Sequence, residues 1–132
     1  MNKRFLKMGA LMGGLTVIFG AFAAHAVKSK VNAETLSVFE TGVRYQMYHV
    51  FAILLVGILF KEFPFKLMIW AGNFFVVGII LFSGSLYLLT YFKGMGNDQM
   101  NWLGAITPFG GTCFIVGWFL LLRSIFLSQK RL

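Results

Sequence analysis

The stretch "LMIWAGNFFVVGIILFSGSLYLLTYF", residues 67–92, carries no charged side chain and decides the fold. A helix needs roughly 20 predominantly apolar residues to cross a bilayer, so this stretch is long enough to span one. Three further uncharged runs cover residues 8–27, 45–60 and 101–122. None shows the alternating pattern of a barrel strand, and lipid leaves helices as the other way to satisfy backbone groups. The sequence predicts an all-α integral membrane protein, a single domain over residues 1–132 built as a four-transmembrane-helix bundle, with spans at about 6–26, 42–60, 65–91 and 103–123.

Composition supports lipid as the solvent of this chain. Hydrophobic residues make up 58% of the sequence and charged residues only 12%, with a mean hydropathy of +0.79. A water-soluble domain of this size would lack the polar atoms to cover its surface. The net charge of +8 comes from basic residues that flank the apolar runs, a distribution that disfavours nucleic acid and favours anionic lipid headgroups as partners. The single cysteine, Cys113, excludes an intrachain disulfide.

The basic residues also predict the orientation of the spans. By the positive-inside rule, the side with more Lys and Arg is cytoplasmic. One side would carry Lys3, Arg4, Lys7, Lys61, Lys66, Arg123, Lys130 and Arg131, and the other Lys28, Lys30, Arg44 and Lys93. We therefore expect a multi-pass protein of the plasma (inner) membrane with both termini in the cytoplasm.

The first apolar run has two interpretations. In "GAFAAHAVK", residues 20–28, Ala24-His25-Ala26 fits the small-x-small cleavage site of a secretory signal peptide. The uncharged run is nevertheless longer than the roughly 7–15 residues of a typical signal core, which favours a retained helix. Small residues recur along one face of that helix, and small faces let membrane helices pack closely. This face is formed by Gly9, Gly13, Thr16, Gly20 and Ala24. Further packing positions are expected at Gly84 on the third helix and at Gly110 and Gly111 on the fourth.

The second span has a helical start outside the membrane. Asn32 is a suitable N-cap, and Glu34 follows in the first turn, where the helix dipole favours an anion. From that cap the helix would exceed the hydrocarbon thickness. Residues 33–44 therefore form either a short interfacial helix with Gly42 as the hinge, or the first turns of one long, tilted helix.

Polar side chains concentrate near the outer ends of the predicted spans. "TGVRYQMYH", residues 41–49, is the densest polar stretch, and the topology places polar residues of the first and third helices at the same depth. The candidate outer-leaflet cluster consists of His25, Arg44, Tyr45, Tyr48, His49, Ser83 and Tyr87. Such a cluster would bind a lipid headgroup or small anion, act as a proton-linked switch through its histidines, or provide hydrogen bonds between helices. Two histidines alone do not complete a metal site, and we find no catalytic arrangement and no cofactor motif, so neither an enzyme nor a cofactor is expected.

Four blocks of the sequence together resemble a known family. "GAFAAHAV", "TGVRYQMYH", "LFSGSLYLL" and "GAITPFGGTCFIVGW" are similar, in order and spacing, to the signature blocks of the YgdD/YwdK family of small bacterial inner-membrane proteins, which has eukaryotic transmembrane relatives. Ala23 stands where the family pattern has glycine. The resemblance implies a polytopic membrane protein with a retained first helix and, in some members, an association with membrane integrity, but no catalytic activity or agreed ligand. The motif positions carried over are Gly20, His25, Arg44, Tyr45, Gln46, His49, Ser83, Gly84, Ser85, Pro108, Gly110, Gly111 and Trp118.

These observations favour a non-enzymatic protein with a structural or lipid-interacting role in membrane organisation or integrity. The alternative is a small carrier or accessory subunit that moves or senses a proton or solute through the His/Tyr/Arg cluster. Because glycine faces serve contacts between chains as well as within one, a homo-oligomer and another membrane protein both stay open as partners.

Overall fold

The computed structural model describes residues 1–129 and is helical almost throughout. Helix α1 covers Lys3–Phe22 and continues into a π-helical turn, η1, over Ala23–Val27. Helix α2 covers Ala33–Leu59, and α3 covers Lys66–Gly94. A 3₁₀ helix, η2, over Asp98–Ala105 leads into α4, Thr107–Gln129. No strand occurs in residues 1–129, so the all-α prediction is confirmed.

Within the described residues, four helical segments are long and apolar enough to cross a membrane. They are Lys3–Val27, Ala33–Leu59, Lys66–Gly94 and Asp98–Leu127, with a mean hydropathy of 1.4 to 2.0 in their apolar windows. Many large hydrophobic side chains along them are exposed, including Leu11, Phe51 and Phe119. In a bilayer this surface faces lipid, and an apolar outer face is what a lipid environment requires of a helix.

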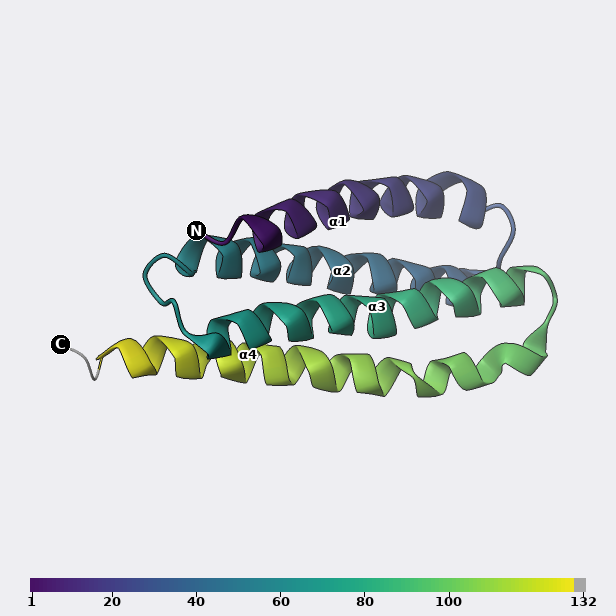
Figure 1. Cartoon of the computed structure of the whole chain (residues 1–132). Coiled ribbons are helices and arrows are strands. Elements are labelled where there is room, and N and C mark those ends of the chain that lie inside the picture. The colour runs from purple at the N-terminus through teal and green to yellow at the C-terminus, as the bar shows by residue number, and fades with distance from the viewer. Residues whose placement is uncertain (130–132) are drawn as a thin grey trace.

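Consecutive helices run antiparallel and lie side by side (Figure 1). Helix α1 packs on α2, α2 on α3, and α3 on α4. The start of α1 and the end of α4 lie at one end of the bundle with the α2–α3 connection, and we call this the terminal end. The opposite end holds the α1–α2 and α3–α4 connections, and we call it the distal end (Figure 1).

The interior changes character along the bundle. The apolar core is closest to the terminal end, where Phe5, Ile53, Val56, Met68 and Phe75 are fully buried. Most of the buried polar side chains lie in the middle and distal parts, at Thr16, Thr35, Gln46, His49, Ser83, Ser85 and Thr90, whereas the buried Ser124 lies in the last turns of α4. The candidate site is therefore a region of polar contacts on the distal side of the apolar core.

Helix α2 settles the alternatives left by the sequence. The Asn32 side chain accepts a hydrogen bond from the Thr35 backbone N–H at 2.8 Å, which caps the helix as expected. From Ala33 the helix then runs without a break to Leu59, so there is no separate interfacial helix. Gly42 does not act as a hinge. It is buried at a close contact between α2 and α3, where a Cβ would lie 2.9 Å from Cε1 of Tyr87.

The structure corrects part of the predicted small-residue packing. A Cβ on Gly9 would lie 2.6 Å from the Leu54 side chain, and one on Gly110 would meet the Phe82 backbone, so both glycines are at close helix contacts. Added Cβ atoms at Gly13 and Gly20 would make only ordinary contacts, with Val50 at 3.4 Å and Val43 at 3.8 Å. A Cβ on Gly84 would meet no atom within 4 Å, and one on Gly111 would lie 3.9 Å from the nearest atom. Ala24 is exposed. Close contacts that the sequence did not single out occur at Gly42, Gly57, Gly72, Gly78 and Gly117.

The α1 face explains the correction at Ala24. The buried residues Gly9, Thr16 and Ala23 follow one another at intervals of seven, which is about two helical turns. Ala24 is one residue further along and so lies about 100° around the helix from that line. The buried line therefore ends at Ala23.

Candidate functional site

Gln46 of α2 joins three helices through its amide. The side chain is 4% exposed. Its Nε2 donates to the Met12 carbonyl of α1 at 3.3 Å, and its Oε1 accepts from the Tyr87 hydroxyl of α3 at 2.8 Å. An amide has both donors and an acceptor, so one side chain can bond in both directions. We call this arrangement the Gln46 bridge.

Two serines of α3 complete the links between helices. Ser83 is fully buried, and its hydroxyl donates to the Gly42 carbonyl of α2 at 2.7 Å. Ser85 lies 2.8 Å from the Thr107 hydroxyl at the start of α4. Hydrogen bonds of this kind stabilise helix contacts in membranes by about 0.6 kcal/mol each on average.

His49 has hydrogen bonds on both ring nitrogens. Its Nδ1 lies 2.7 Å from the Tyr45 carbonyl, which can only accept, so Nδ1 carries the proton. Trp118 Nε1–H of α4 then donates to His49 Nε2 at 3.3 Å. The contacts assign the neutral imidazole with the proton on Nδ1.

Aromatic rings enclose the same imidazole. The Phe114 ring stacks on it with centroids 3.4 Å apart and planes 6° from parallel. Phe75 and Trp118 lie around it with centroids at 5.7 Å and 6.2 Å, and the imidazole side chain is 5% exposed. We call His49, Phe75, Phe114 and Trp118 the His49 stack.

The structure brings together part of the predicted cluster. Tyr45 lies beside His49. Tyr87 contacts α2 about one turn from His49, at Gln46, and Ser83 contacts it about two turns away, at Gly42. Along α2, His49 lies about 24 Å from Ala33 and about 15 Å from Leu59. His49 is therefore nearer to the terminal end of α2 than to its distal end.

Three predicted residues lie outside this group. Tyr48 is 56% exposed and faces away from the interior, although its ring meets Tyr45 edge-on. Arg44 is exposed, and its guanidinium donates to Thr41 on its own helix at 3.2 Å. His25 is exposed in the π-helical turn and lines a shallow hollow with α1 residues only. His25 is two residues beyond the buried Ala23, so it lies on the opposite, outer side of the first helix. Its position along the span, from which the sequence placed it in the cluster, does not fix the face on which it lies.

Sequence reasoning missed the residues that complete these contacts. Gln46 lies within the densest polar stretch, but helical periodicity alone does not show that its side chain meets both α1 and α3. Phe114 and Trp118 lie on α4, whose contacts with α2 depend on how α4 is rotated. Periodicity gives the faces of one helix but not which face meets which neighbour, so no sequence signal pointed to the His49 stack.

Tyr87→Phe tests the Gln46 bridge. The variant removes the hydroxyl and leaves Gln46 Oε1 without its donor, and we expect a loss of about 1 kcal/mol in the free energy of unfolding. Thermal or SDS unfolding in mild detergent measures this change. The double variant Gln46→Leu/Tyr87→Phe should lose less than the sum of the two single changes, because neither variant group then needs a partner. Strictly additive losses would contradict the bridge.

The fold and the site together define a polytopic helical membrane protein whose interior polar groups are bonded between helices. The family described as "Protein of unknown function (DUF423)" matches residues 19–111, and the chain belongs to this family.

Relatives of the chain confirm the resemblance seen in its sequence. It is 39% identical to the UPF0382 membrane protein YwdK of Bacillus subtilis over 90% of this chain and 93% of that protein. It is 41% identical to a UPF0382 membrane protein of Staphylococcus aureus over 94% of this chain and 96% of the relative. A UPF0382 membrane protein of Haemophilus influenzae is 37% identical over 98% of this chain and 99% of its own length. No solved structure matches the chain.

Proposed function

We propose that the protein is a non-enzymatic component of the plasma membrane that supports membrane organisation through its packing and its contacts with anionic lipids. The observation that carries this proposal is that buried polar side chains form hydrogen bonds between the helices. Gln46, Ser83 and Ser85 all bond to neighbouring helices. Such bonds hold a bundle in one arrangement while its outer surface meets lipid.

The ends of the bundle support the orientation with both termini in the cytoplasm. Lys3, Arg4 and Lys7 lie near the start of α1, and Lys61 and Lys66 flank the α2–α3 connection at the same end (Figure 1). This terminal end carries the larger share of Lys and Arg in short connections, as cytoplasmic ends do. The same basic residues are suited to the anionic headgroups of that leaflet.

The geometry of the His49 stack favours this proposal over a proton carrier. A relay histidine passes its proton between groups that donate on one side and accept on the other. Here one nitrogen is bonded to a backbone carbonyl and the other to an indole N–H, which has no acceptor. His25, the second histidine of the proposed carrier, lies apart on the exposed side of α1.

Reconstituted vesicles test the proposal. The full-length protein is inserted into vesicles that contain phosphatidylethanolamine and phosphatidylglycerol, with protein-free vesicles as the control. We expect the protein-containing vesicles to retain an encapsulated dye longer after an osmotic downshift. Proton uptake under an imposed pH gradient should equal that of the control. Faster dye release would contradict the membrane-supporting role, and protein-dependent proton uptake that His49→Gln abolishes would establish the carrier instead.

A further inference from the structure

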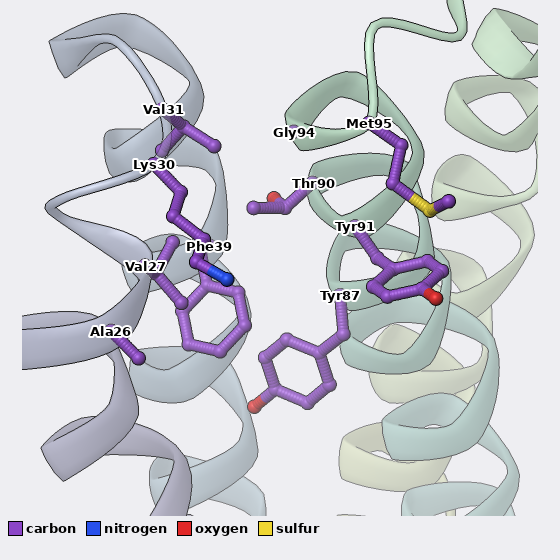
Figure 2. A pocket seen from close by; sticks show the side chains of 10 residues that line it. All are labelled: Ala26, Val27, Lys30, Val31, Phe39, Tyr87, Thr90, Tyr91, Gly94 and Met95. Carbon is purple, nitrogen blue, oxygen red and sulfur yellow. The ribbon is translucent and has the colours of Figure 1, made fainter.

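A cavity lies at the distal end of the bundle, between the α1–α2 connection and the last turns of α3 (Figure 2). Its volume is about 280 Å³, many times the roughly 30 Å³ that a water molecule occupies in the liquid. Val27 and Phe39 form an apolar wall on one side, and Tyr91 and Met95 lie on the other (Figure 2). The cavity is therefore mainly apolar and lies at the ends of the helices that it joins.

One buried hydroxyl in this cavity has no partner. Thr90 is 3% exposed, and its Oγ1 makes no hydrogen bond within residues 1–129. Threonines in helices usually donate to the carbonyl four residues earlier, as Thr16, Thr41 and Thr112 do here. The Thr90 side chain points instead across the gap toward the opposite wall (Figure 2). A buried polar group without a partner is costly, so this hydroxyl is suited to a ligand in the cavity.

A positive charge enters the cavity from the other side. The Lys30 side chain extends from the α1–α2 connection toward the Phe39 ring and lines the cavity (Figure 2). Its ammonium has no ion-pair partner among the residues that the structure describes. The cavity thus combines a cation, an unpaired donor and apolar walls, which match a ligand that is anionic at one end and apolar at the other.

We propose that this cavity binds the phosphate-bearing headgroup of an anionic glycerophospholipid from the leaflet at the distal end. Thr90 donates a hydrogen bond to a phosphate oxygen, and Lys30 neutralises the phosphate charge. The glycerol backbone and the first acyl carbons lie against Val27, Phe39 and Tyr91. The inference rests on the lipid-interacting role proposed above and adds to it a specific site at the opposite, distal end of the bundle. Apolar walls favour a lipid over free phosphate, because a fully hydrated ion would lose water contacts there.

Native mass spectrometry of the full-length protein in mild detergent tests the site, with phosphatidylglycerol titrated as the probe. We expect Lys30→Gln and Thr90→Val each to weaken phosphatidylglycerol binding about tenfold, the scale of one charge-assisted hydrogen bond. Thr90→Ser keeps the hydroxyl and should retain most of the affinity. Excess inorganic phosphate should not displace the lipid.

Two matched controls separate this site from general effects. Lys28→Gln removes an exposed charge from the same connection, at a residue that does not line the cavity. Ser124→Ala removes another buried hydroxyl without a partner, far away on α4. Both should leave the affinity unchanged, and Thr90→Val should melt no lower than the parent protein without lipid, since it loses no internal hydrogen bond.

Three results would overturn the inference. They are unchanged binding in Thr90→Val, equal losses in Lys28→Gln and Lys30→Gln, and displacement of the lipid by inorganic phosphate, which would make the site one for a soluble anion. The dye-retention experiment fails or succeeds separately. Site-specific lipid binding without dye retention would support this inference and refute the membrane-supporting role. Dye retention together with lipid binding that is unchanged in Lys30→Gln and Thr90→Val would support the membrane-supporting role and refute this inference.

Discussion

Gly110→Ala is expected to separate α4 from α3 and to cost at least about 3 kcal/mol of folding free energy, at the upper end of overpacking changes. A Cβ on Gly110 would lie 2.7 Å from the Cα of Phe82 and would also meet its backbone nitrogen. A side chain can rotate away from such a contact, but the backbone of a packed helix cannot. Size-exclusion chromatography in mild detergent, followed by thermal unfolding, measures the loss of monodisperse folded protein.

The neighbouring glycine supplies the control for this prediction. A Cβ on Gly111 would come no closer than 3.9 Å to the Phe82 side chain, which is an ordinary contact. Gly111→Ala adds the same methyl group to the same turn of α4 and should leave stability within about 0.5 kcal/mol. Equal losses in the two variants would show that α3 and α4 do not approach at Gly110.

His49→Leu has the second largest expected effect, a loss of about 2–4 kcal/mol. The variant leaves the Trp118 N–H without an acceptor in the interior, which costs about 1–3 kcal/mol. It also removes the ring that stacks on Phe114 at 3.4 Å, a contact worth about 0.5–1.5 kcal/mol beyond area burial. Unfolding in detergent, monitored by tryptophan fluorescence and circular dichroism, measures the change.

A double variant isolates the hydrogen bond within the His49 stack. Trp118→Phe removes the indole N–H, so the pair His49→Leu/Trp118→Phe should be less destabilised than the two single losses summed. The recovery should be about 1 kcal/mol or more, because the unsatisfied donor is then absent. A folded and fully stable His49→Leu protein would show that this histidine has no structural role and would return it to consideration as a titrating group.

Much of the fold could be predicted because each membrane span is a property of a single segment. Residues 67–92 lack charge over more than the length of a bilayer, and α3 follows them closely. The start of α2 was predictable for a similar reason, because the Asn32 side chain caps the first turn of its own helix. The side-chain cluster was predictable only in part. Tyr45 lies beside His49 on α2, and Ser83 and Tyr87 bond to α2 from α3, whereas His25 lies apart from them.

The rest depended on how the helices are rotated about their axes. In water, a polar face and an apolar face would orient each helix, but in lipid the outer faces are apolar too and carry little such information. Thr90 illustrates this limit, because no pattern marks it apart from the threonines that bond within their helices.

The sequence by itself determined the solvent, the spans and the family of this protein, since those follow from hydropathy, charge and local capping along one segment at a time. Only the tertiary structure decided that Gln46 bridges three helices, that Trp118 and Phe114 enclose His49, and that Lys30 and Thr90 share a cavity. Each of these contacts joins residues far apart in the chain, and each depends on the close approach of backbones that helix rotation and small residues such as Gly42 and Gly110 permit.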